Sequence, residues 1–365
     1  MGAYTAVNDS SAHFQTLLYT GNATGSRALT NDGNSDLQPD WLWIKQRNAT
    51  KNHAIWDSSR GVTKQLRTNL SNAEASNTAN DTLVSLDSDG FTLGDDTDSV
   101  GVNENSNTYV AWQWKANGGT TTTNDASSTG VGSIDSVIQA NTTAGFSIVT
   151  WTGTGSAGTI AHGLGVAPKV MWIKNRDKNS QFAVYHKDIG ATHYLDTTDN
   201  QQKADYDGYF NDTHPTTTVF SVGSDGDVSG GSNEKVVAYC FAEVAGYSRF
   251  GSYLGNANNS GPYIYTGFKP AWILIKISDG HDESWHVWDT ERDANGNPNR
   301  EPLSPNTTGS EIGGDSTPYD IDFCANGFKI REDHDITNGD GDRYIYMAFA
   351  KNPFVTSTGV PTTAR

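Results

Sequence analysis

The sequence predicts an all-β protein built of three tandem β-sandwich units, of jelly-roll or lectin-like type, each of about 100 residues. Two observations lead to this prediction. The chain has 38 glycines and 10% aromatic residues among its 365 residues, which is typical of short strands, many turns and aromatic cores. One phrase, a proline followed by large apolar residues and a lysine, also occurs three times: PDWLWIK at 39–45, PKVMWIK at 168–174 and PAWILIK at 270–276.

Four further landmarks accompany each phrase in the same order, as internal repeats require. An opening strand precedes it, and an aromatic residue, a phenylalanine and a closing strand follow it. The opening strands are TLLYTGN (16–22), IVTWTGT (148–154) and FGSYLGN (250–256); the aromatic residues are Trp56, Tyr185 and Trp288; the phenylalanines are Phe91, Phe220 and Phe328; the closing strands are YVAWQW (109–114), VVAYCF (236–241) and YIYMAF (344–349). Three copies are too few for a propeller, so each copy is expected to close its own sandwich.

The landmarks place the domain boundaries. The three units are expected at 1–116, 134–245 and 246–354. A polar, low-complexity linker is expected at 117–133 and a flexible tail at 355–365.

Local patterns refine each unit. Asp89-Gly90 and Asn326-Gly327 predict primed-turn hairpins, whereas Val62, Leu66 and Leu70 predict one helical turn at most. The repeated phrase and the closing strands are apolar at consecutive positions, so both faces of these strands are expected to be covered. The next repeat, a long loop or another copy of the chain are the possible covers.

Charge and composition exclude several classes of protein. A net charge of −17 disfavours nucleic-acid binding and an anionic membrane surface. The N-terminus lacks the pattern of a secretory signal, and no run of about 18 apolar residues predicts membrane insertion. Cys240 and Cys324 are expected to be buried thiols without a disulfide.

The sequence contains only weak candidates for cofactor- and cation-binding motifs. Gly153-x-Gly155-x-x-Gly158 is followed by a poor helix opening, so a hairpin is expected there instead of a dinucleotide site. The acidic loop from Asp293 matches a calcium loop only in part, and the loop at 338–343 is a weak candidate for a hard cation. Solvated turns are the alternative for both.

The histidines and tryptophans are further candidates, for metal ligation and for ligand binding respectively. His281 and His286 flank two acidic residues without a spacing typical of metal ligands. Core packing is expected for the tryptophans at repeated positions, namely Trp43, Trp56, Trp112, Trp172 and Trp288. Trp151 and Trp285 are better candidates for exposed, ligand-binding rings. No catalytic, cofactor-binding or metal-binding residue is predicted.

The phrases GFSIVTWTGTGSAGTIAHGLGVAPKVMWIKNR, FAVYHKDIGATHYL and VVAYCFAEVAGYSRFGSYLGN carry a resemblance that spans roughly 14–354. The sequence of this region is similar to a repeat domain of unknown function in virion proteins of tailed bacteriophages, especially those of marine bacteria. The first copy departs most, with NHAIWDSSRG in place of FAVYHKDIG and no HGLG segment. The resemblance implies a phage structural protein and transfers no catalytic residue or cofactor.

The expected function is therefore a non-enzymatic tail fibre or adhesion protein on the exterior of the virion, on the tail rather than the head. Its expected partners are copies of itself, most simply as a homotrimer by analogy to fibres, other virion proteins and a host-surface glycan. The alternatives are a capsid decoration or head-fibre protein, an envelope-polysaccharide depolymerase, or a carbohydrate-binding module without a virion role.

Overall fold

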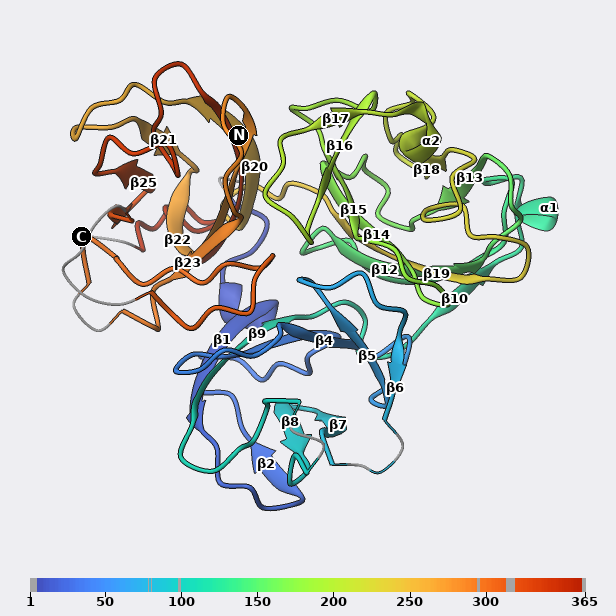
Figure 1. Ribbon diagram of the computed structural model, residues 1–365, viewed down its shortest axis with the longest axis horizontal. Helices are drawn as coiled ribbons and strands as arrows, with labels where there is room; N and C mark the ends of the chain where they lie inside the picture. The colour runs from blue at the N-terminus through green and yellow to red at the C-terminus, as the bar shows by residue number, and fades with distance from the viewer. Residues whose placement is uncertain are drawn as a thin grey trace.

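The computed structural model describes residues 5–77, 79, 81–97, 100–293, 296–312 and 319–362. It confirms the all-β prediction, with 40% of the chain in strands and 3% in helices. The strands form three lobes around a common centre, and each lobe contains a large and a small antiparallel sheet (Figure 1).

The first lobe comprises β1 to β9 and follows a short 3-10 helix, Ser10–Ala12. Its large sheet has the order β1-β9-β3-β4-β5-β6 and its small sheet the order β2-β8-β7. The strands are β1 Phe14–Thr20, β2 Arg27–Leu29, β3 Trp41–Gln46, β4 Ala54–Asp57, β5 Lys64–Arg67, β6 Ala75–Ser76, β7 Leu83–Asp87, β8 Gly90–Leu93 and β9 Thr108–Trp114.

The second lobe has the largest sheet, in the order β10-β11-β12-β19-β14-β15-β16-β17, and a small sheet of β13 and β18. The strands are β10 Thr122–Asn124, β11 Ser136–Asn141, β12 Phe146–Thr152, β13 Gly158–Ala161, β14 Val170–Asn175, β15 Ala183–His186, β16 His193–Asp196, β17 Ala204–Asp205, β18 Val219–Val222 and β19 Lys235–Phe241. Two helical turns, α1 Ala126–Thr129 and α2 Asp207–Phe210, accompany them. The segment expected to be a linker thus contains β10 and α1.

The third lobe has a large sheet in the order β20-β26-β22-β23 and a small sheet in the order β21-β25-β24. The strands are β20 Ser248–Leu254, β21 Tyr263–Tyr265, β22 Phe268–Asp279, β23 His286–Asp289, β24 Ile321–Cys324, β25 Gly327–Ile330 and β26 Arg343–Pro353.

One four-strand order recurs in the three large sheets. It is β1-β9-β3-β4 in the first lobe, β12-β19-β14-β15 in the second and β20-β26-β22-β23 in the third. The repeated phrase ends in β3, β14 and β22, and the three closing strands are β9, β19 and β26. Positions that share a place in this order are called equivalent below.

Two local predictions need correction. The hairpins β7–β8 and β24–β25 exist, but their loops are not primed turns. Neither the loop residues Ser88 and Asp89 nor the loop residues Ala325 and Asn326 have a positive φ. Gly90, at the start of β8, takes φ +105° instead. Leu66 lies in the strand β5, with Val62 and Leu70 outside it and none of the three in a helix, because pairing with β4 outweighs the local periodicity.

Each lobe has its own core between its two sheets. In the first lobe Ile44 and Trp56 of the large sheet join a cluster with Phe91 of the small sheet. Met171 and Phe220 join a corresponding cluster in the second lobe, and Trp288 and Phe328 do so in the third. The side chains on one face of each large sheet are thereby removed from water.

The opposite faces of the three large sheets meet in one central core. Its members come from all three lobes, and many of them are aromatic. The ring of Trp43 lies 5.8 Å from that of Trp172 in the second lobe and 6.4 Å from that of Trp272 in the third, between centroids. The strands are therefore apolar on both faces because the other large sheets of the same chain cover the second face.

The lysine that ends each repeated phrase lies buried beside this core. Lys45, Lys174 and Lys276 are each 0% exposed, and each ammonium donates a hydrogen bond to a backbone carbonyl of a different lobe. The acceptors are Thr308 O at 3.3 Å for Lys45, Ser71 O at 2.9 Å for Lys174 and Asn200 O at 3.0 Å for Lys276. The three bonds run in one direction around the molecule, from the first lobe to the third, the third to the second and the second to the first.

Candidate functional site

The two tryptophans expected to be exposed are buried, so that prediction is wrong. Trp151 is 4% exposed and packs edge-on against Phe220. Trp285 is 2% exposed and donates through Nε1 to Asp196 O at 2.7 Å, between the third and second lobes. All ten tryptophans of the chain are buried, which confirms the core interpretation for those at repeated positions.

The glycine signature at 153–158 is a connection between two sheets. It links β12 of the large sheet to β13, which pairs with β18 and not with β12. The expected hairpin is therefore wrong, and a strand follows where a phosphate-binding helix would begin. Gly153 has its own role, because a Cβ there would lie 2.5 Å from the backbone of Gly230.

The acidic loop that starts at Asp293 uses its polar side chains for local structure. Asn297 accepts from the backbone N–H of Phe323 at 2.8 Å and donates to its carbonyl at 2.9 Å. Asn299 donates to Asp289 O at 2.8 Å. These amides fasten the loop to β24 and β23. The loop positions 294–295 lie outside the described residues.

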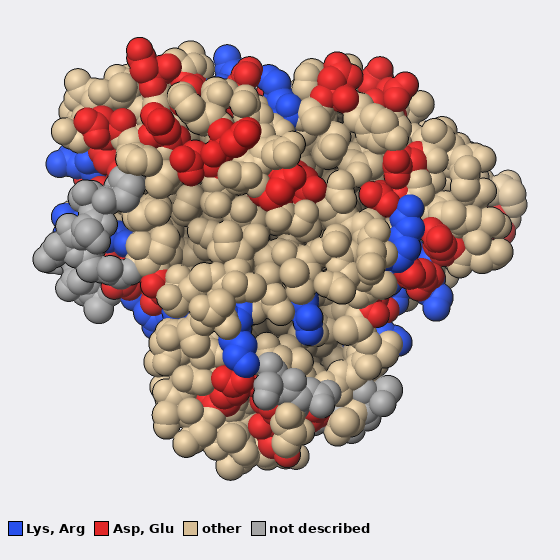
Figure 2. Space-filling view, viewed as in Figure 1, with Lys and Arg blue, Asp and Glu red and all other residues tan. Residues whose placement is uncertain are grey.

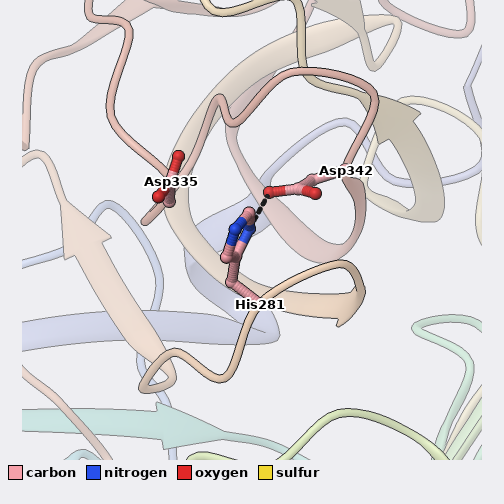
Figure 3. Close-up of side chains that lie close together, drawn as sticks. All are labelled: His281, Asp335 and Asp342. Carbon is pink, nitrogen blue, oxygen red and sulfur yellow. Dashed lines mark hydrogen bonds and ion pairs between the residues drawn. The ribbon is translucent and has the colours of Figure 1, made fainter.

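The second acidic loop contributes to a small cluster of possible cation ligands. Asp335 and Asp342 lie in the segment between β25 and β26 and face His281, which follows β22 (Figure 3). One ligand atom from each of these three residues lies within 4.8 Å of the other two. His281 Nδ1 is 2.8 Å from Asp342 Oδ2.

The surroundings of this cluster fix the Asp342 carboxylate. Asp342 is 6% exposed, and it packs so closely on Gly280 and Gly339 that a Cβ at either glycine would lie 2.1 Å from a carboxylate oxygen. The hydrogen bond and charge of Asp342, with a smaller contribution from Asp335, raise the pKa of His281. The two carboxylates therefore stabilise the protonated form of the His281 imidazole.

A cluster of one imidazole and two carboxylates can also ligate a divalent metal. A mixed nitrogen and oxygen set suits a transition-metal dication better than Ca²⁺, which prefers six to eight oxygens. Sequence reasoning found the 338–343 loop but not His281 as its neighbour. The two segments are 61 residues apart, and only the pairing of β22 with β26 brings them together.

The two cysteines are free, as expected. Cys240 is 0% exposed, and burial raises its pKa to about 12. Cys324 is half-buried, and burial followed by the charge of Asp322 raises its pKa. Since the thiolate is the reactive form, neither thiol is activated.

Comparison with known proteins identifies the family. A family described as Domain of unknown function (DUF7483) matches residues 9–353. The chain belongs to this family. No curated protein was found to match the sequence. Among the described residues of this DUF7483 chain, no helix is long and apolar enough to cross a membrane.

Proposed function

We propose that this DUF7483 chain is a structural protein of the virion exterior of a tailed bacteriophage, a tail fibre or adhesion protein made of three tandem β-sandwich units. In this proposal the protein has no catalytic activity, and loops at its surface contact the host envelope. The phage assignment rests on the resemblance of the repeated phrases to virion proteins. The structural role rests on the way in which the three lobes are joined.

The proposed scaffold role rests on similar contacts that recur at each of the three junctions between lobes. Besides the three buried lysines, three ion pairs join neighbouring lobes: Arg47 with Glu311 at 2.7 Å, Arg176 with Glu74 at 2.8 Å and Lys203 with Asp279 at 2.8 Å. Glu311, Glu74 and Lys203 each also donate a backbone N–H to the opposite strand end, to Arg47 O, Arg176 O and Ser278 O. Such repeated contacts favour three units held as one rigid body.

Buried polar pairs close the same junctions nearer the centre. Tyr239 of the second lobe donates to Asp57 of the first at 2.7 Å, and Trp112 of the first donates to Asp289 of the third at 2.9 Å. Asp57 and Asp289 each also pair with a buried arginine of their own lobe, Arg60 and Arg292. A scaffold of this kind can carry variable loops without loss of its core.

The surface is consistent with a protein that is crowded on a particle. Acidic side chains gather over the outer parts of the second and third lobes (Figure 2), and the net charge is −17. Like charges of this size keep neighbouring proteins apart and favour solubility.

Immunogold electron microscopy tests the proposed location. Purified virions are labelled with antibody raised against the recombinant chain, and antibody preabsorbed with that chain is the control. Label at the distal end of the tail is the expected result. Label over the capsid would instead support a decoration protein, and absence of label from all virions would contradict the proposal.

A separate assay tests the proposed absence of catalysis. Host envelope polysaccharide is incubated with the chain, and newly formed reducing ends are measured. We expect none above a heat-denatured control. Release that rises with protein concentration would support a depolymerase instead.

A further inference from the structure

In the first and second lobes, an ion pair joins the loop after the repeated phrase to the segment before the closing strand. Lys51, in the loop after β3, pairs with Glu104, between β8 and β9. Lys178, in the loop after β14, pairs with Asp227, between β18 and β19, at 2.9 Å. In both lobes a lysine ammonium therefore fastens one loop to the other.

The third lobe joins the same two segments with different chemistry. The loop after β22 supplies the imidazole of His281, and the segment between β25 and β26 supplies two carboxylates, those of Asp335 and Asp342 (Figure 3). An ammonium has no lone pair to offer a metal, whereas neutral imidazole is a common metal ligand. Among the residues that the structure describes, no other His, Cys, Asp and Glu side chains form such a group. Two negative charges beside an imidazole favour a dication.

The Asp342 carboxylate is buried with a single partner. Only 7% of its side chain is exposed, and among the described residues the His281 ring is its one hydrogen-bond or ion-pair partner. Other buried carboxylates have several donors. Asp96 accepts from four backbone N–H groups, and Asp40 accepts from three and from Ser58. Because a buried carboxylate with so few partners is costly, an ion at Asp342 would supply bonds that the protein does not.

The cluster combines one fixed ligand with two adjustable ones. Gly280 and Gly339 enclose the Asp342 carboxylate closely, whereas the His281 side chain is 59% exposed. One ligand atom of each residue lies within 4.8 Å of the other two. Bonds of about 2.1 Å to one ion place its ligand atoms up to about 4.2 Å apart. Small rotations of His281 and Asp335 therefore complete the set.

We propose that His281, Asp335 and Asp342 bind one divalent transition-metal ion of the Zn²⁺ class, which fastens the segment between β25 and β26 to the loop after β22. Imidazole nitrogen with carboxylate oxygen suits such ions, whereas Ca²⁺ and Mg²⁺ prefer oxygen ligands. A proton held by His281 leaves to solvent when the ion binds. The ion does in the third lobe what the lysine pairs do in the other two. The inference goes beyond the proposed function and does not depend on it.

Titration of the full chain with Zn²⁺ tests the inference. A chain without a polyhistidine tag is freed of metal with a chelator and titrated in a calorimeter at neutral pH. We expect one site per chain with a dissociation constant in the micromolar range or below, and the site should persist in a millimolar excess of Mg²⁺. Absence of Zn²⁺ binding, or its displacement by an equal concentration of Ca²⁺, would overturn the inference.

Variants locate the ion. Asp335→Asn and His281→Gln each remove one ligand and should weaken Zn²⁺ binding about tenfold or more. Asp333→Asn is the matched control, because it removes an exposed carboxylate from the same segment, and it should bind as the wild type does. Equal affinity of the wild type and Asp335→Asn would place the ion elsewhere and contradict the inference.

Hydrogen exchange followed by mass spectrometry tests the fastening role. Zn²⁺ should slow exchange of the backbone amides of residues 331–342 in the wild type and leave it unchanged in His281→Gln. Unchanged exchange in the Zn²⁺-bound wild type would overturn this role.

His281→Lys gives the third lobe the ammonium that the other two lobes use. Its melting temperature without metal should equal or exceed that of the metal-free wild type. Zn²⁺ should raise the melting temperature of the wild type, because it binds the folded state, and should not raise that of His281→Lys. A similar Zn²⁺-dependent rise in both proteins would contradict the assignment of His281 as a ligand.

Discussion

The ammonium group of Lys174 in the second lobe donates to the carbonyl oxygen of Ser71 in the first lobe at 2.9 Å. It also donates to the carbonyl of Ser180 in its own lobe. Through these two bonds Lys174, on β14, connects the loop of Ser71 in the first lobe to the loop of Ser180 in its own lobe. Burial lowers the pKa of Lys174 to about 8, and the opposing charges of Asp227 and Asp196 are too weak to restore it. Burial of the Lys174 ammonium costs solvation free energy, and its two hydrogen bonds offset that cost.

Lys174→Met is expected to lower the free energy of unfolding by about 3 kcal/mol, because the carbonyls of Ser71 and Ser180 lose a charged donor in a buried place. Guanidinium chloride unfolding measures the change. Lys235→Met, at an exposed position of β19, is the matched control and should stay within about 0.5 kcal/mol of the wild type. Equal effects of the two variants would show that the bond between the lobes is unimportant.

The effect of Lys174→Met should grow with pH. The folded pKa of Lys174, about 8, lies below the ordinary value of 10.5, so between these values the unfolded chain binds one more proton. The free energy of unfolding of the wild type therefore gains roughly 1.4 kcal/mol per pH unit from this residue over that window, and the Met variant lacks the gain. Unfolding curves at pH 7.5 and 9.5 measure it. A constant difference between the two proteins would contradict the shifted pKa.

Much of the fold could be predicted from the sequence because its landmarks lie on strands. Trp43, Tyr185 and Phe328 occupy the expected strands, since a repeated apolar position marks a buried site in every copy. The central core could not be predicted in the same way. Apolar residues on both faces show that a strand is covered, and whether Trp172 or a partner chain covers Trp43 depends on the packing of whole lobes. The cluster of His281 and Asp342 could not be predicted either, because it depends on the pairing of β22 with β26 across 61 residues of sequence.

Glu332→Gln should stabilise the protein at neutral and alkaline pH. Glu332 is 4% exposed, and its Oε2 has no hydrogen-bond partner among the described residues. Burial, followed by the charges of Asp320 and Asp333, raises its pKa to about 8 against the hydrogen bond from Thr337.

Because the folded state holds this proton more tightly, the wild type loses stability as the pH rises from about 4.5 to 8. The neutral amide of the Gln variant removes that loss. The two proteins should have similar melting temperatures at pH 4.5, and the variant the higher one at pH 8.5. Asp205→Asn, on the exposed strand β17, is the control, and its melting temperature should match that of the wild type at both pH values. A wild type that is the more stable at pH 8.5 would disprove the assignment.

The His281 imidazole should titrate above its ordinary value of 6.5, because Asp342 accepts its hydrogen bond and attracts its charge. A pH titration of the histidine ring signals by NMR measures this pKa. Asp342→Asn should lower it, and Asp335→Asn should lower it less, in the order of their contributions. Since His281 is exposed, the fold should tolerate its titration. Identical titration in all three proteins would show that the pair is absent in solution.

The mass in solution tests how the chain associates. The homotrimer is expected by analogy to fibres alone, and another copy of the chain was one of three possible covers for the doubly apolar strands. The central core supplies that cover within one chain. Light scattering after size exclusion should therefore give about one chain mass, 39.3 kDa, at micromolar concentration. A trimer mass would instead require a surface outside the central core. In that case the trimer should survive substitutions such as Trp172→Leu, which perturb the core without touching the outer surface.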